Sequence, residues 1–170
     1  LWVGLRYSLM VVPSILVLSL LLASFIKTLG KRGAAILKTT VYVPTVVSVV
    51  ITALIFVFIY QDTGFANWFV GLLGQGPVAW LNNDGTALPA VSVPGIWLGF
   101  GVATLIMLAA ILDIPESYYE SASLEGAGWW QRTRYITLPM LRNVFLYLLV
   151  TSFTLTMQEY LLPLIMTNGG

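Results

Sequence analysis

The chain has 170 residues, of which 58% are hydrophobic and 9% are charged, and its formal net charge is +1. Soluble domains carry about 25% charged residues, so a water-soluble protein of this size could not bury so much apolar surface, and lipid must be its solvent. The sequence contains no cysteine and no histidine, which excludes disulfides, thiolate chemistry, His-ligated metals and a triad with an imidazole base. No long basic run is present, so nucleic acid is not an expected partner.

Four apolar segments follow one another along the chain, at 8–26, 39–60, 90–112 and 143–166. The first three contain no charged residue, and the fourth contains only Glu159. A helix needs about 20 apolar residues to cross the hydrocarbon core. The sequence therefore predicts an all-α, polytopic membrane helical bundle with about four transmembrane helices. A buried core helix is the alternative for any one segment, but not for four in series.

The positions of lysine and arginine predict the orientation of the bundle. Segment 27–38 holds four of the eight basic residues, segment 113–142 holds three, and segment 61–89 holds none. The positive-inside rule therefore places the first two segments in the cytoplasm and the third outside. Arg6 is the exception, and its long side chain could reach the outer interface.

The outer connection contains the apolar stretch 65–74, which is too short to span a membrane. We expect a short helix in the interface, anchored by Trp68, and a turn at 81–85. A lid on the lipid interface is the favoured interpretation of this connection. A substrate-delivery surface is the alternative.

The third apolar segment is followed by a polar insert. Asp113 and Glu116 have the spacing of a capping box, and Pro115 suits a first helical turn. These residues predict a cytoplasmic helix that begins near Ile114.

Gly126 and Gly128 should end that helix, because glycine readily adopts the left-handed turn found at helix ends. A second short helix is expected over 129–137, with Pro139 breaking it before the last span. The insert is then a helix–turn–helix across the membrane face. It is either a docking surface for a cytoplasmic partner or a plain interfacial helix held by Trp129 and Trp130.

The insert resembles the EAA loop of importer-type ABC transporter permeases. That pattern reads Glu-Ala-Ala, three residues, Gly, nine residues, Ile-x-Leu-Pro, with serine here in place of the first alanine. It falls on Glu120, Ser121, Ala122, Gly126, Ile136, Leu138 and Pro139. The stretches WLNNDGTALPAV, IPESYYE and TNGG resemble the carbohydrate-uptake branch of the family, in particular the larger maltose permease subunit.

The resemblance implies a membrane-spanning subunit of an ATP-driven sugar importer. In the family this loop is a coupling helix that docks in a cleft of the ATP-binding subunit. The residues implied in coupling are Glu120, Ser121, Ala122, Gly126, Ala127, Ile136, Leu138 and Pro139. Glu120 is expected to face basic residues of that motor. Other implied partners are a sister permease, an extracytoplasmic sugar-binding protein, a sugar or oligosaccharide, and the bilayer.

The chain has no P-loop sequence, so we expect it to bind no nucleotide, to need no cofactor and to be no enzyme, with ATP used by the partner subunit. Relatives usually have six or more spans. The expectation is a single permease domain over 1–170, lacking a span at each end. The expected location is the prokaryotic inner membrane, which the chain crosses several times.

A polar stripe in the last apolar segment suggests where a substrate would lie. Ser152, Thr156 and Glu159 have the spacing of one helix face, and a charge inside a span usually faces water or a partner. Alternatively, the hydroxyls bond back to their own helix and Glu159 lies near the outer interface. In the third segment, the four-residue spacing of Gly95, Gly99 and Ala103 favours a helix–helix contact over a pocket.

The resemblance to maltose-type permeases implies a sugar path on the spans before and after the loop. By position it comprises Leu98, Gly99, Val102, Ser152, Leu155, Thr156, Glu159 and Leu161. Because Glu159 is the only charge in the four segments, we expect a neutral or hydroxyl-rich sugar and no phosphate ester.

Two other function classes are alternatives to transport. A membrane-embedded hydrolase would need a nucleophile and base, and no span contains a Ser–Lys pair. A pore or scaffold subunit with a cytoplasmic interface helix is the alternative that stays open.

Overall fold

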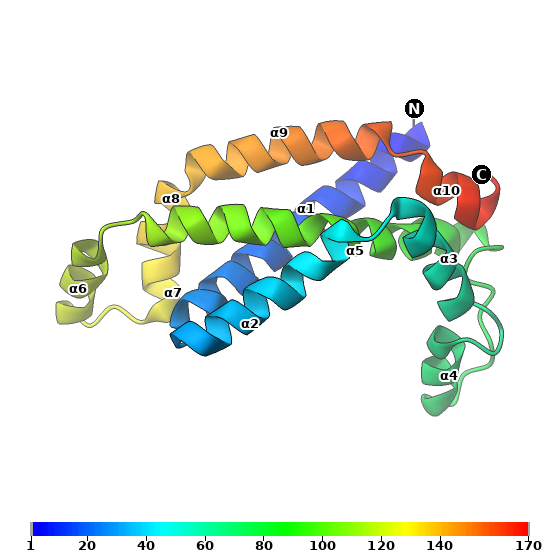
Figure 1. Ribbon diagram of the computed structural model, residues 1–170, viewed down its shortest axis with the longest axis horizontal. Helices are drawn as coiled ribbons and strands as arrows, with labels where there is room; N and C mark the ends of the chain where they lie inside the picture. Colours follow the sequence, from blue (N-terminus) through cyan, green and yellow to red (C-terminus); the bar gives the residue numbers. More distant parts are fainter. Residues whose placement is uncertain (1, 170) are drawn as a thin grey trace.

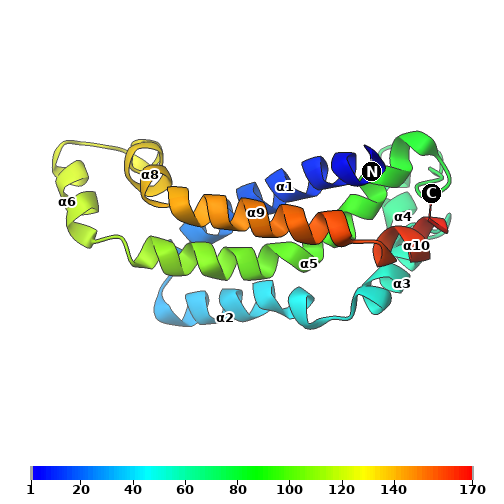
Figure 2. The same cartoon turned by 90° about the horizontal axis from the view of Figure 1, so that it is seen from above.

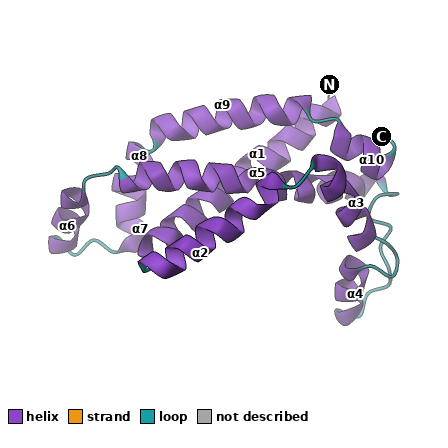
Figure 3. Ribbon diagram, in the orientation of Figure 1, coloured by secondary structure: helices purple, strands orange, loops and turns teal. Residues whose placement is uncertain are grey.

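The computed structural model describes residues 2–169, and all regular structure in that range is helical (Figures 1 and 3). The elements are α1 (Trp2–Thr28), α2 (Lys31–Tyr42), the 3₁₀ turn η1 (Val43–Val46), α3 (Val49–Ile59), α4 (Phe65–Leu72), α5 (Asp84–Leu112), α6 (Glu116–Leu124), α7 (Trp129–Arg132), the π turn η2 (Thr133–Thr137), α8 (Leu138–Met140), α9 (Arg142–Gln158) and α10 (Leu161–Thr167). The predicted all-α fold is confirmed.

Within residues 2–169, two helices are long and apolar enough to cross a membrane, α1 and α5. Two more spans result if bent pairs of helices each count as one. These pairs are Lys31–Val46 with Val49–Ile59, bent by 97°, and Trp129–Met140 with Arg142–Gln158, bent by 68°. The described part of the chain thus has two to four candidate spans, and the upper number is the predicted one.

The second predicted span, 39–60, is not one straight helix, which corrects the sequence prediction. α2 already begins at Lys31, inside the segment predicted as a loop, and it ends at Tyr42. Pro44 then lies in η1, and the extended backbone of Ser48 precedes α3. Proline lacks the N–H that a continuing helix needs. The apolar run is therefore folded into two pieces.

The last predicted span, 143–166, is also interrupted. α9 ends at Gln158, Glu159 has an extended backbone, and α10 begins at Leu161. In a continuous helix the ring of Pro163 would clash with the carbonyl group four residues earlier, which belongs to Glu159. The expected single helix face through Ser152, Thr156 and Glu159 is therefore wrong, because Glu159 lies beyond the helix end.

The long helices α1 and α5 pack closely along each other, and small residues of α5 allow their approach. A Cβ atom added to Gly99 would lie 2.6 Å from Cδ1 of Ile15, and one added to Gly95 would collide with the Tyr7 hydroxyl. Ser19 of α1 donates a hydrogen bond of 3.1 Å to the carbonyl oxygen of Phe100. The predicted helix–helix contact of the small-residue stripe is present, but its members Gly95, Gly99 and Ala103 also line a cavity among the long helices.

Figures 1 and 2 show that the loops sort to the two ends of the bundle. α6, α7 and α8 lie at one end, where α1 ends and α2 begins. α3, α4 and α10 lie at the other end, with both termini. The predicted cytoplasmic segments 27–38 and 113–142 thus share one end, and the predicted outer connection 61–89 occupies the opposite one.

The outer connection is held together by one buried amide. Asn67 of α4 donates to the carbonyl oxygens of Gln61 and Val78, each at 3.1 Å. Its side-chain oxygen accepts from the Val78 N–H at 2.8 Å and from Trp80 Nε1 at 3.1 Å. The expected short helix is present as α4. The predicted turn at 81–85 lies at the start of α5, where Asn83 accepts a bond from the Gly85 N–H.

Candidate functional site

The first helix of the polar insert, α6, begins at Glu116, two residues after the predicted start near Ile114. Asp113 lies at the end of α5, and no side-chain hydrogen bond caps α6. The predicted capping box is therefore wrong. The physical reason is Pro115, which disfavours a helical backbone in the residue before it and itself has ψ of 131°.

α6 ends in a tight turn at Gly126, as predicted. The backbone of Gly126 is left-handed, with φ of 76°. Its N–H donates to the Ser123 carbonyl oxygen at 3.1 Å, and the Ala127 N–H donates to the Ala122 carbonyl oxygen at 2.9 Å. These two bonds form a Schellman motif, which satisfies carbonyl groups that the helix leaves free. The conformation favours glycine at this position.

The second helix of the insert begins at Trp129, as predicted, but Pro139 does not break it. The chain widens into the π turn η2 just before the proline, and it continues as α8 to Met140. A π turn relieves the clash that a proline ring causes in a regular helix. The bend of 68° comes after Met140, at the start of α9.

Five of the eight predicted coupling residues line one hollow of about 480 Å³ at this end of the bundle, namely Ser121, Ala122, Gly126, Ala127 and Ile136. Glu120 is exposed on α6, whereas Leu138 and Pro139 lie in α8, outside the hollow. Large apolar side chains stand out beside it, and Leu124 is 91% exposed. Trp129, Trp130 and Tyr135 are also exposed.

A second cavity, of about 430 Å³, lies among the long helices. We refer to it as the central cavity. Seven of the eight predicted path residues line it: Leu98, Gly99, Val102, Ser152, Leu155, Thr156 and Glu159. Leu161, the first residue of α10 after the break in the last span, does not line it, although its neighbour Leu162 does. The polar lining residues that the sequence did not indicate are Tyr7, Thr45, Tyr147 and Thr151.

The polar groups of the central cavity are partly bonded to the protein itself. Thr156 Oγ1 lies 2.9 Å from the Ser152 carbonyl oxygen and 3.0 Å from Ser8 Oγ on α1. The hydroxyl thus both bonds back to its own helix and joins two helices. Glu159 Oε1 accepts bonds from the Leu161 and Leu162 N–H groups, at 2.9 and 3.2 Å. The carboxylate therefore satisfies two N–H groups at the start of α10, which have no carbonyl partner in a preceding helical turn.

Tyr7 and Glu159 border two cavities at once. Both line the central cavity and also an outer cavity of about 500 Å³, which Arg6 and Asp84 border as well. The Tyr7 ring is buried against Gly95 of α5. Nothing in the sequence spacing indicated Tyr7, since its place depends on the packing of α1 on α5. These two side chains are therefore shared by the central cavity and by an outer cavity that charged residues border.

Residues 7–170 match a family described as binding-protein-dependent transport system inner membrane component. The chain is 31% identical over 150 residues to the trehalose/maltose transport system permease protein MalF of Thermococcus litoralis, covering 86% of this chain and 51% of that protein. The chain spans about half the length of the curated relatives it matches.

Two solved structures are similar to the described fold. One is a bacterial ABC transporter involved in the import of the acidic polysaccharide alginate, with a TM-score of 0.80, 27% identity, and coverage of 97% of this chain and 60% of that one. The other is a bacterial alginate ABC transporter in complex with an alginate pentasaccharide-bound periplasmic protein. It has a TM-score of 0.78, 30% identity, and coverage of 89% and 54%.

Proposed function

The chain belongs to the family of binding-protein-dependent transport system inner membrane components, and we propose that it forms the membrane-spanning part of an ATP-driven sugar importer. The observation that carries this proposal is the glycine turn at Gly126. It presents a hollow and exposed aromatic residues at the end of the bundle where the basic residues gather. A soluble motor can reach the permease only at such a polar end.

The proposed role of the insert is to couple this chain to an ATP-binding subunit. Ser121, Ala122, Gly126, Ala127 and Ile136 share the hollow in which the contact would form. Glu120 is exposed nearby and free to face basic residues of the motor. The exposed side chain of Leu124 would be covered on docking, which removes apolar surface from water and favours the contact.

The proposed substrate path runs through the central cavity. The relatives named above transport trehalose or maltose in one case and an acidic polysaccharide in the other, so the family does not decide the charge of the substrate. In this chain Glu159 borders the cavity. A neutral sugar fits a carboxylate acceptor better than a phosphate ester does, because like charges repel more strongly away from water.

Uptake by the assembled transporter tests the function. The full-length protein would be reconstituted in liposomes with the ATP-binding subunit, sister permease and binding protein from neighbouring genes. Maltose, trehalose, alginate oligosaccharide and glucose 6-phosphate would be offered with and without internal ATP. ATP-dependent uptake of a neutral sugar supports the proposal. Efficient uptake of the phosphate contradicts the role of Glu159, and uptake without ATP would favour a pore.

A further inference from the structure

The helix α6 makes few contacts with the rest of the bundle. None of its residues, Glu116–Leu124, is buried. No other described helix packs closely along it, and Figure 1 shows it standing away from the long helices. If an ATP-binding subunit displaces α6, the displacement can reach the spans only through contacts between α6 and other helices. The contacts between α6 and other helices therefore determine how such a displacement is transmitted.

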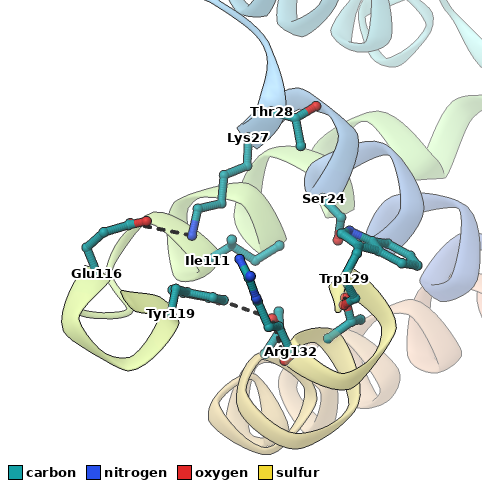
Figure 4. A pocket seen from close by; sticks show the side chains of 10 residues that line it. Ser24, Lys27, Thr28, Ile111, Glu116, Tyr119, Trp129 and Arg132 are labelled. Carbon is teal, nitrogen blue, oxygen red and sulfur yellow. Dashed lines mark hydrogen bonds and ion pairs between the residues drawn. The ribbon is translucent and has the colours of Figure 1, made fainter. Parts of the chain in front are cut away.

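One ion pair, one cation–π contact and one side-chain hydrogen bond join α6 to other helices in the described structure, and all three meet around Lys27 and Tyr119 (Figure 4). Lys27 Nζ, in the last turn of α1, lies 3.7 Å from the centre of the Tyr119 ring. It also lies 3.8 Å from Glu116 Oε2. The Tyr119 hydroxyl is 3.0 Å from Thr137 Oγ1 in η2.

The contact between Lys27 and the ring is the stronger of the two that Lys27 makes. The Glu116 side chain is 69% exposed, and ion pairs in water contribute little. The Lys27 side chain is only 24% exposed, and a cation over an aromatic ring gains strength as water is removed. The Thr137 side chain at the other end is buried. Tyr119 is thus held from both sides, by α1 and by η2.

The contacts cross a cavity of about 300 Å³ that otherwise separates the end of α1 from the insert. On the N-terminal side of Lys27, α1 packs along α5 and α9. It borders the central cavity at Ile15 and at Tyr7, which lie 12 and 20 residues, or about 18 and 30 Å, along the helix from Lys27. A displacement of α6 transmitted to Lys27 therefore reaches one continuous helix, α1, that borders the proposed substrate path.

We propose that Lys27, acting through Tyr119, is the positioning residue that transmits motion of α6 to α1, an inference that rests on the proposed transport function. We call the contact series from Lys27 through Tyr119 to Thr137 the bridge. Neither Lys27 nor Tyr119 touches the substrate. Their removal should leave binding and ATP hydrolysis intact and reduce the sugar moved for each ATP.

The first experiment measures the ratio of sugar imported to ATP hydrolysed in reconstituted transporters. Lys27→Met and Tyr119→Leu should each lower this ratio by about fivefold, the factor that a half-buried cation–π contact is worth. Lys27→Arg keeps a cation over the ring and should restore the ratio. Lys31→Met removes a nearby exposed charge and serves as the matched control, with no change expected.

Tyr119→Phe separates the two halves of the bridge, because it keeps the ring and removes only the bond to Thr137. Its ratio should lie between those of the unmodified protein and Tyr119→Leu. Since the ring lies on a helix without buried residues, these variants should fold even if Lys27→Met does not. A normal ratio in both Lys27→Met and Tyr119→Leu would overturn the proposal.

The second experiment needs no transport. Spin labels on cysteines at Ser117 and Gly33, both exposed, report the distance between α6 and the start of α2 in the assembled complex. Lys27→Met should broaden the distance distribution, and Lys31→Met should leave it unchanged. If the unmodified assembly imports no sugar, the proposed function fails while this measurement still decides the bridge. An unchanged distribution in Lys27→Met would refute it.

Discussion

Replacing Gly126 should uncouple the transporter without unfolding it. A Cβ atom at this position would meet no other atom within 4 Å, so the cost is in the backbone alone. A left-handed conformation costs a residue with a Cβ about 1–2 kcal/mol, and more for β-branched valine. Because α6 has no buried residue, that cost falls on the local turn and not on the core.

The expected loss of sugar uptake is large because few hydrogen bonds stabilise the turn at Gly126. Two backbone hydrogen bonds, from Gly126 and Ala127, close the Schellman motif. A penalty of about 1–2 kcal/mol shifts such a local equilibrium roughly five- to thirtyfold. Gly126→Val should therefore lose most sugar uptake while ATP hydrolysis continues. Gly126→Asn should retain more, since asparagine tolerates the left-handed region.

The assay combines sugar uptake, ATP hydrolysis and thermal unfolding in detergent for each variant. Gly128→Ala is the matched control, because Gly128 has φ of −72° and room for a Cβ atom. Its uptake and its unfolding temperature should both be normal. Normal coupling in Gly126→Val would refute the role of the turn. A large fall in its unfolding temperature would refute the claim that the strain is local.

Three further outcomes are expected. Glu159→Gln keeps an oxygen that can accept the two N–H bonds at the break, so a loss of sugar uptake in this variant reports the charge alone. Glu159→Ala also loses these hydrogen bonds, which costs about 1 kcal/mol of stability. Full uptake by the alanine variant would contradict the substrate path. Gly101→Ala should lower the unfolding temperature, because its Cβ would lie 2.7 Å from Thr45 Oγ1 and such overpacking costs about 1–3 kcal/mol. Gly71→Ala is the control and should leave the unfolding temperature unchanged, because the space around Gly71 is open. An impermeant thiol reagent added to intact cells should label a cysteine at Gly76 but not one at Gly33, and the reverse labelling would overturn the orientation.

Several features of this protein follow from the sequence because they depend on neighbouring residues or on solvent. The apolar composition requires lipid, and the distribution of basic residues sorts the loops to two ends. Gly126 ends α6 because a left-handed turn favours glycine whatever surrounds it. The spacing of the insert identifies the family, and the family implied seven of the residues that line the central cavity.

Other features were decided only by the tertiary structure. The length of an apolar run does not reveal where proline will divide it, so the breaks before α3 and α10 were not predicted. Glu159 joins the central cavity from an interrupted backbone, and Tyr7 joins it because Gly95 lets α1 approach α5. Lys27 and Tyr119 are 92 positions apart and meet only when α6 folds back to the end of α1. Which individual side chains of distant segments meet depends on how the helices pack and bend, and the residue pattern along one helix does not specify this.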